Sequence, residues 1–391
     1  MVTGITIAPI KHTNMLEYDK KERIKTIFLS LFQLLNYIYP NPNMSRKNNK
    51  NLDDVSLAIF FKDFAHWIRS SCVGLNVAGF TTAKYLNKCG INASAFPVRH
   101  NVDIVYTIDH YNETHKKRLT HVVISAPWLS VYDMKHLIKN FSDIQFVILS
   151  HSNVGFLQAD PHGVELFRKY AELSKIHKNL KVGGNSPQFV NWFRTSYNEE
   201  CVCLPNLYPV SHISSKVWNG SYPIKIGIFG AIRPEKNFMT AAAAALAMHS
   251  ILSIPVEIHM STGGEECKST TLSSIIEMTE HIKGITLIKE NWETWDKFIE
   301  LVKQMDLLIQ VSYTESFNMI TADGISVGVP SVVSPVIRWA PNSWKADADD
   351  ALDVSKVGIK LLTTNQHHIG SDTLHKSNER NLKYWLNFLR N

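Results

Sequence analysis

The chain has 391 residues, of which 45% are hydrophobic and 19% are charged, and its net charge is +6. This length exceeds the size at which a single core keeps growing, so we expect two domains in an ordinary globular protein. No run of about eighteen apolar residues predicts a transmembrane helix, and the N-terminus lacks the order of a signal peptide, so we expect a cytoplasmic protein.

The positive charge is concentrated in the N-terminal half. Residues 1–215 carry 24 Lys and Arg against 16 Asp and Glu, a net +8, whereas residues 216–391 carry 17 against 19, a net −2. An anionic partner of the first half would explain this asymmetry, and so would ordinary solvated surface charge.

Neither the cysteines nor the acidic residues predict a metal site. The five cysteines are an odd count without a repeated Cys-x-x-Cys spacing, so we expect free buried thiols rather than disulfides or a zinc site. The acidic run at 347–350 lies in a polar loop, and we interpret it as solvated.

The first 54 residues differ in pattern from the rest. Residues 24–40 have the apolar spacing of a long helix that ends before Pro40, and an Asn-rich polar loop follows. We expect residues 1–54 to be a helical N-terminal addition that packs on the domain. A membrane-surface helix is the alternative, because basic residues stand at its start.

From Ser56 onward, apolar strands alternate with helical segments, as in α/β proteins. This alternation predicts a Rossmann-like domain over 55–210, a polar linker bounded by prolines at 211–223, a second Rossmann-like domain over 224–375 and a final helix at 376–391. The strands are expected at 56–61, 91–98, 121–127, 144–153, 180–186 and 201–209 in the first half, and at 224–230, 255–261, 285–290, 306–312 and 331–334 in the second half.

Residues 311–334 carry the strongest functional signal. Glu315 and Asp323 are separated by a little over two helical turns, so both can project from one side of the unit. Between them, the backbone N–H groups of 316–319, which belong to Ser316, Phe317, Asn318 and Met319, are placed at a helix N-terminus and form a candidate anion site. Paired carboxylates beside an anion site suit a sugar nucleotide. The alternative is that the two acids are a first-turn residue and a solvated helix residue.

Three further positions follow predicted strands, where open parallel sheets bind ligands. The loop that begins at Gly230 carries Arg233 and Lys236, which suit a diphosphate or are solvated surface charges. His151 directly follows the apolar letters FVILS near the end of the segment expected at 144–153, where it faces the ligand or is a core histidine. Gly74 and Asn76 stand in a predicted glycine-bearing loop after the first strand, which is a weak signal without a dinucleotide fingerprint.

The 311–334 segment resembles the E-x7-E element of the retaining GT-B glycosyltransferases of family four, usually written ESFG, seven residues, E, then GVPVV. The letters TESF, the spacing and GVPSVVS match, while Asp323 stands at the second Glu and Asn318 at the Gly. In the family's G-R-x-x-x-E-K loop, Lys236 stands at the lysine position, but Ala231 stands at the arginine position. Arg233, two residues later, would have to take over the role of that arginine. The resemblance covers roughly residues 56–391.

The resemblance implies an α/β GT-B protein, with two facing Rossmann-like domains, parallel sheets and an interdomain cleft, and a final helix that crosses back to the first domain. It implies transfer of a sugar from a nucleotide-sugar donor, with UDP-glucose as the first candidate, with retention and without a metal or another cofactor. The implied catalytic residues are His151, Glu315, Lys236 and Arg233. The implied donor site adds Gly230, Asp323 and residues 316–319, with Gly74 and Asn76 on the acceptor side.

The acceptor is less defined by the sequence. The phrases GAIRPEKN and LSHSNVGFLQADP are similar to glycosyltransferase-like proteins of large bacterial viruses, which points to hydroxymethylated pyrimidines in bacteriophage DNA as acceptor and to the host cytoplasm as location. An envelope polysaccharide or lipid-linked acceptor is the alternative within enzymes. A GT-B module that binds nucleotide sugars without transfer is the alternative outside them.

Overall fold

The computed structural model describes residues 52–62, 73–210, 218–262, 270–364 and 367–391. Most of the expected N-terminal addition and residues 211–217 of the expected linker therefore lie outside the described residues. Of the addition, only a 3₁₀ turn at Leu52–Asp54 is described. The two sheets described below belong to a single unit, Lys50–Asn391.

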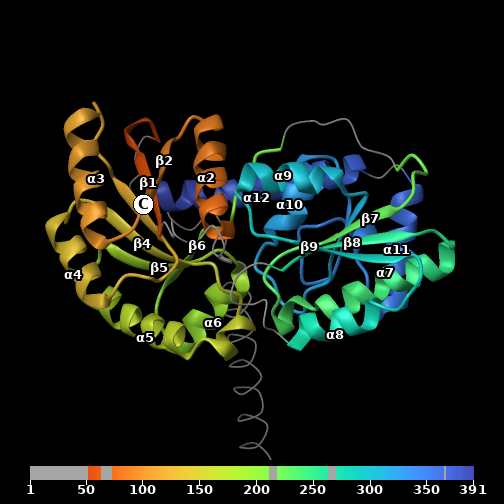
Figure 1. Cartoon of the computed structure of the whole chain (residues 1–391). Coiled ribbons are helices and arrows are strands. Elements are labelled where there is room, and N and C mark those ends of the chain that lie inside the picture. The colour runs from red at the N-terminus through yellow and green to blue at the C-terminus, as the bar shows by residue number, and fades with distance from the viewer. Residues whose placement is uncertain (1–51, 63–72, 211–217, 263–269, 365–366) are drawn as a thin grey trace, which may run out of the picture. The chain divides into compact units, whose positions relative to one another are not determined.

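The first half forms a six-stranded, fully parallel sheet in the order β2-β1-β3-β4-β5-β6 (Figure 1). Its central strands are continuous apolar runs because both of their faces are covered. The strands are β1 (Ser56–Lys62), β2 (Asn92–Val98), β3 (His121–Ser125), β4 (Gln145–Ser150), β5 (Leu180–Gly184) and β6 (Cys201–Cys203).

Helices cover both faces of this sheet. One face packs against α3 (Asn101–Thr114), α4 (Val131–Asn140), α5 (Pro161–Ile176) and α6 (Pro187–Tyr197). The other packs against α2 (Val73–Lys88) and the end of α12 (His367–Arg390). Local chemistry explains where several helices begin: the side chains of Ser130, Asp160 and Ser186 cap α4, α5 and α6, and Pro161 and Pro187 occupy the first helical positions.

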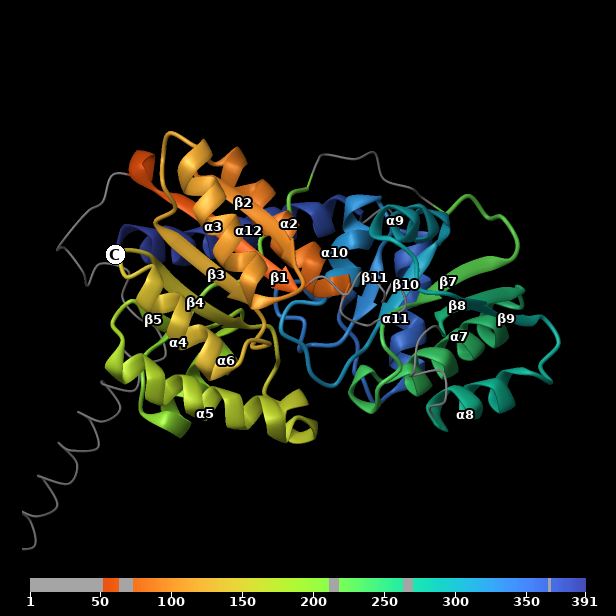
Figure 2. The same cartoon turned by 60° about the vertical axis from the view of Figure 1, so that its left-hand side comes forward.

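The second half forms a five-stranded parallel sheet in the order β11-β10-β7-β8-β9. Figure 2 shows β7, β8 and β9 side by side with α7 and α8 below them. The strands are β7 (Ile224–Ile228), β8 (Val256–Ser261), β9 (Ile285–Glu290), β10 (Leu307–Gln310) and β11 (Ser331–Val333).

The alanine run of α7 (Phe238–Leu252) is buried against this sheet, which agrees with a helix pressed closely onto the strands. Beside it lie α8 (Thr270–Thr279) and α11 (Ala351–Thr363). The other face packs against α9 (Trp295–Gln304) and residues of α10 (Met319–Ser326). The fold is thus α/β with two parallel Rossmann-like sheets, as the alternation of strands and helices predicts.

The final helix joins both halves. It begins at His367 rather than at residue 376, contacts α10, and inserts Trp385, Phe388 and Leu389 into the core of the first sheet. No helix in the described part of the chain is long and apolar enough to cross a membrane. Of the cysteines whose placement is described, three are free thiols: Cys201 is buried and Cys203 partly so, but Cys89 is exposed, so the expectation of burial is wrong for Cys89.

Candidate functional site

The two loops with the strongest sequence signals follow β7 and β10, which are neighbours in the second sheet. After β7 the chain proceeds to β8 on one side, whereas β10 and β11 lie on the other side. The strand order therefore reverses between β7 and β10, and such switch points form a crevice at the carboxyl ends of the strands. The backbone joins the two loops, because Tyr313 N donates to Glu235 O at 2.9 Å. Parallel-sheet topology thus brings together residues about 80 positions apart.

The loop after β7 positions a lysine. Gly230 has φ +120°, a conformation that residues with a side chain rarely adopt, and it begins the turn away from the strand. A 3₁₀ turn, Pro234–Lys236, then carries the Lys236 side chain, which is 26% exposed, back toward the neighbouring loop. Ala231, at the position of the family arginine, is buried. Arg233 lines the pocket described below, and its guanidinium lies 5.1 Å from the centre of the Phe156 ring.

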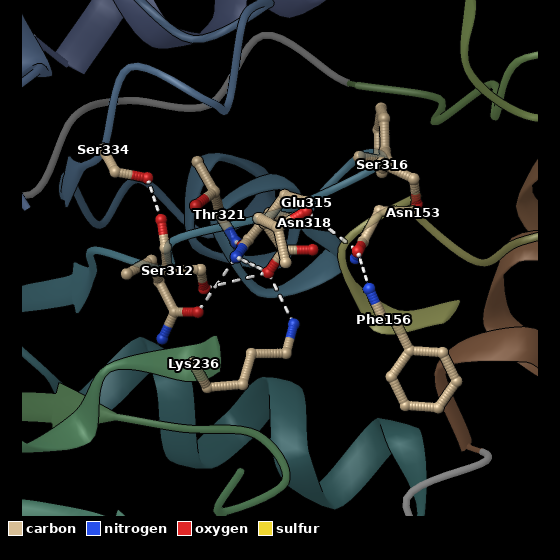
Figure 3. A network of polar contacts seen from close by, with 12 residues as sticks. Asn153, Phe156, Lys236, Ser312, Glu315, Ser316, Asn318, Thr321 and Ser334 are labelled. Atoms are coloured by element: carbon tan, nitrogen blue, oxygen red, sulfur yellow. Dashed lines mark hydrogen bonds and ion pairs between the residues drawn. The ribbon is translucent and has the colours of Figure 1, made fainter. Parts of the chain in front are cut away.

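Glu315 is the centre of a polar network at the end of β10 (Figure 3). Its Oε1 accepts from Lys236 Nζ at 2.5 Å, from Ser312 Oγ at 3.1 Å and from Asn318 Nδ2 at 3.0 Å. The side chain is only 7% exposed, so the ion pair is shielded from bulk water. Among the described residues, no donor contacts Oε2. The carboxylate is therefore fixed through one oxygen, and the other is left for a ligand.

Asn318 shapes the turn between Glu315 and α10. Its φ is +65°, which agrees with a position where the family has glycine, and asparagine adopts this region more readily than most residues. Its Oδ1 caps the helix by accepting from Thr321 N at 2.8 Å, and its Nδ2 also donates to Gln310 Oε1 at 3.1 Å. Because α10 begins at Met319 with Asn318 as its N-cap, the expectation of a helix N-terminus is wrong for 316 and 317, which lie in the turn before it.

Asp323 is buried on α10 and is not the solvated residue of the alternative interpretation, since it is 2% exposed. Its Oδ1 accepts from Tyr208 Oη at 2.7 Å and from Trp295 Nε1 at 3.1 Å. Burial raises the pKa of this carboxyl to about 7, although both hydrogen bonds act in the opposite direction.

His151 comes from the first half, directly after β4. Its Nε2 lies 3.0 Å from Ser125 Oγ, and its Nδ1 lies 3.4 Å from Asn185 Nδ2. Burial lowers the pKa of the imidazole to about 4, so the ring is neutral at pH 7. A neutral imidazole held in this way suits orientation of a ligand better than proton abstraction.

Side chains of the first half contact the loop after β10 directly. Ser316 Oγ donates to His151 O at 3.1 Å and accepts from Asn185 Nδ2 at 3.1 Å. Thr314 Oγ1 donates to Asn153 Oδ1 at 2.8 Å. Glu315 therefore lies between two residues that are anchored to the first half.

These residues surround a pocket of about 280 Å³. The sequence-predicted residues that line it are Gly74, His151, Gly230, Arg233, Lys236, Glu315, Ser316, Phe317, Asn318, Met319 and Asp323. Asn76 does not line it. Gly74 and Asn76 belong to the first turns of α2 rather than to a loop, so that expectation is wrong. A glycine in a first turn does not exclude a helix, because the N–H groups there have no intrahelical partner.

Sequence analysis missed several residues of the site. Asn185 follows β5 and is 3% exposed, and its Oδ1 accepts no hydrogen bond from the residues that the structure describes. Three aromatic residues form a wall of the pocket: Trp292 before α9, and Trp295 and Phe298 in its first turn. The position of Asn185 at the end of a predicted strand was an available signal. The contribution of Trp295 depends on packing between helices that the sequence alone does not show.

No group of three or more His, Cys, Asp or Glu side chains in the described ranges is arranged to hold a metal ion. The charged groups of the pocket are instead Arg233, Lys236, Glu293, Glu315 and the ionisable Asp323.

No protein-family model matches the chain. No curated protein matches it either. Solved structures do match, at low sequence identity.

HepE of Anabaena in complex with UDP-glucose has 12% identity and a TM-score of 0.51, with 85% of this chain and 98% of that chain covered. An alpha-glucosyltransferase in complex with UDP-glucose and DNA containing an abasic site has 10% identity and a TM-score of 0.52, with 84% and 95% covered. TarM of S. aureus in complex with UDP has 12% identity and a TM-score of 0.50, with 69% of this chain but only 55% of TarM covered. At this identity the likeness concerns the fold alone, and the fold that the chain shares with these structures is GT-B.

Proposed function

We propose that this protein is a glycosyltransferase that moves a sugar from a UDP-sugar to an acceptor hydroxyl. The observation that carries the proposal is the Lys236–Glu315 ion pair at the switch point of the second sheet, inside a pocket that His151 lines from the first half. A cation for a diphosphate and a carboxylate oxygen for sugar hydroxyls thus stand side by side. The shared fold of UDP-glucose complexes adds support.

In the proposed reaction, the bond between the anomeric carbon and the diphosphate oxygen breaks while the acceptor oxygen bonds to the same carbon. The acceptor proton passes to the departing phosphate. Lys236 and Arg233 stabilise the negative charge that develops on the leaving group, an electrostatic route that needs no metal. The family resemblance carries the expectation that the transfer retains the anomeric configuration.

Other groups of the pocket would orient the donor. Glu315 Oε2 would accept from hydroxyls of the sugar, and the neutral imidazole of His151 would fix the sugar from the opposite wall. Asp323 would accept from the ribose. Trp295, which donates to Asp323, and Trp292 line the pocket and would offer apolar surface for the base.

For the acceptor we propose hydroxymethylated pyrimidine in viral DNA. The +8 net charge of residues 1–215, from 24 Lys and Arg against 16 Asp and Glu, would supply phosphate contacts. One structural neighbour is an alpha-glucosyltransferase in complex with DNA, which agrees with this proposal.

The test is transfer of radiolabel from a panel of nucleotide sugars, led by UDP-glucose, to duplex DNA with and without 5-hydroxymethylcytosine. Label confined to hydroxymethylated DNA, lost in Glu315→Ala and kept in Glu300→Ala, would support the proposal. Glu300 is a suitable control because it is an exposed carboxylate of the same half. Absence of binding to every donor would contradict it.

Two other outcomes identify the alternatives. Donor hydrolysis without labelled DNA would direct the search to envelope polysaccharide or lipid-linked acceptors. The affinity for such an acceptor should not depend steeply on salt concentration. Donor binding without hydrolysis or transfer would indicate a non-catalytic module. The buried Ala231 at the family arginine position is the observation that favours such a module.

A further inference from the structure

The chain segment that leaves the first sheet is held by one face of α12. Residues 205–208 follow β6 and lie buried between the two halves. Three side chains spaced along one face of α12 bind the backbone of this segment. Trp385 Nε1 donates to Pro205 O at 2.8 Å, Asn381 Nδ2 donates to Asn206 O at 3.2 Å, and Asn378 exchanges two bonds with Tyr208, at 3.1 Å to its N and 2.7 Å to its O.

This anchoring fixes the direction of the Tyr208 side chain. The residue is 2% exposed, and its Oη donates to Asp323 Oδ1 at 2.7 Å. Burial and the neighbouring carboxyl raise the pKa of the Tyr208 hydroxyl above its usual range, so the hydroxyl stays protonated and acts as a donor. Trp295 Nε1, from α9, donates to the same oxygen at 3.1 Å.

The two donors leave one oxygen of Asp323 for the pocket. Both bonds end on Oδ1, and within the described ranges no protein donor contacts Oδ2, while Asp323 lines the pocket. A buried carboxylate is costly unless its acceptor capacity is used. A ligand hydroxyl that donates to Oδ2 would use the remaining acceptor capacity of this carboxylate.

We propose that Tyr208 is a positioning residue for the donor: it orients Asp323 so that Oδ2 accepts from the ribose, and it links donor binding to the segment that α12 anchors. The inference rests on the proposed function, because it concerns the donor of that reaction. It adds a residue outside both sequence motifs, and Tyr208 lies 115 positions before Asp323.

Tyr208→Phe tests this role with little change of shape, since it removes one hydroxyl. The matched control is Tyr170→Phe, because Tyr170 is also fully buried and its Oη donates to Leu129 O in the core of the first half. The probe is UDP, and its affinity is measured by calorimetry from pH 5.5 to pH 9 in the full chain.

The expected result is specific in its pH dependence. In the wild type, affinity for UDP should fall as pH drops through about 7, where Asp323 takes up a proton. Without the Tyr208 hydroxyl the carboxylate is less stabilised, so Tyr208→Phe should shift this fall to higher pH and weaken binding at pH 7 about tenfold. Tyr170→Phe should leave the profile in place. The other charged groups of the pocket, Arg233, Lys236, Glu293 and Glu315, and His151 are the same in all three proteins.

A second probe separates orientation from stability. UDP lacking a ribose hydroxyl should bind the wild type about tenfold more weakly than UDP, and this difference should shrink in Tyr208→Phe. An unchanged pH profile in Tyr208→Phe, or equal effects of the two tyrosine variants, would overturn the inference while the proposed function stands. If the wild type binds neither UDP nor any nucleotide sugar, the proposed function fails first and the inference fails with it.

Discussion

Lys236 and Glu315 depend on each other. Three donors reach Oε1 of Glu315, and only Lys236 among them carries a charge. Since the carboxylate is 7% exposed, removal of the lysine leaves a shielded negative charge where the diphosphate should bind. In the proposed reaction, the pair would therefore set the charge of the site before the donor binds.

We expect Lys236→Met to lower kcat/KM for the donor by at least about 100-fold, because it removes a cation and leaves Glu315 to repel the diphosphate. Steady-state kinetics with UDP-glucose would check this. Lys297→Met is the control, since Lys297 is exposed and lies on α9, which also lines the pocket. Equal kinetics of the two variants would show that Lys236 does not contact the donor.

The ionised carboxylate of Asp323, which the proposed function uses, lowers the stability of the folded chain. Its pKa is about 7 in the folded chain, whereas an unfolded aspartate has a pKa of about 3.9, so the folded state binds the proton more tightly. The stabilisation of the folded state by proton binding to Asp323 is fully present below about pH 4 and is lost as pH rises through about 7.

The difference in free energy of unfolding between Asp323→Asn and the wild type should therefore shift in favour of Asp323→Asn by about 1–3 kcal/mol from pH 5 to pH 8, because the amide cannot ionise. Urea unfolding at the two pH values measures this, with the exposed Asp296→Asn as control. A constant difference between Asp323→Asn and wild type across this range would show that Asp323 titrates normally.

At the scale of elements, the turn before α10 decides where the site residues point. Asn318 combines a positive φ with three side-chain hydrogen bonds, one of them to Glu315. The turn is followed by a helix that lies tightly on β10, since a Cβ on Gly324 would meet Leu308 Cδ1 at 2.7 Å. A change in this turn should therefore move both Glu315 and the start of α10.

We expect Asn318→Ala to cost about 2–3 kcal/mol of unfolding free energy, because it adds backbone strain to the loss of a cap and of buried hydrogen bonds. Asn318→Gly keeps the conformation and should cost about 1 kcal/mol. Denaturant titration would measure both. The same pair of substitutions at Asn198, whose φ is +52° and which caps the end of α6, isolates the strain alone. Equal costs of Ala and Gly at position 318 would contradict the strain argument.

Sequence analysis predicted well the features that depend on local pattern. Continuous apolar strands and the loops after β7 and β10 were found, because each is encoded within about 20 neighbouring residues. The helices α3, α5 and α11 were not predicted as elements. Tyr208 and Trp295 were missed for a different reason: both meet Asp323 only through tertiary packing of α9, α10 and α12.

At the scale of the whole molecule, the contacts at Ser316 join the halves that hold His151 and Glu315. One hydroxyl accepts from Asn185 and donates to the backbone of His151. The adjacent Thr314–Asn153 bond adds a second contact. These bonds couple the position of the loop after β10 to the first half, so they should favour the arrangement in which both walls of the pocket are assembled.

Ser316→Ala should reduce kcat about tenfold while changing donor affinity less, because the second half holds most of the donor in the proposed complex. It should also speed amide hydrogen exchange of residues 151–157, which would be measured by mass spectrometry. Ser274→Ala, which removes an exposed hydroxyl on α8, is the control. Unchanged exchange in Ser316→Ala would show that the bond does not hold the two walls together.

The central claim is that the pocket at the switch point holds a nucleotide sugar, and a crystal structure with UDP-glucose tests it most directly. The account predicts a diphosphate beside Lys236, ribose hydroxyls at Asp323 Oδ2, and the sugar between Glu315 and His151. Nucleotide bound outside this pocket, or no bound nucleotide at millimolar concentration, would contradict the account.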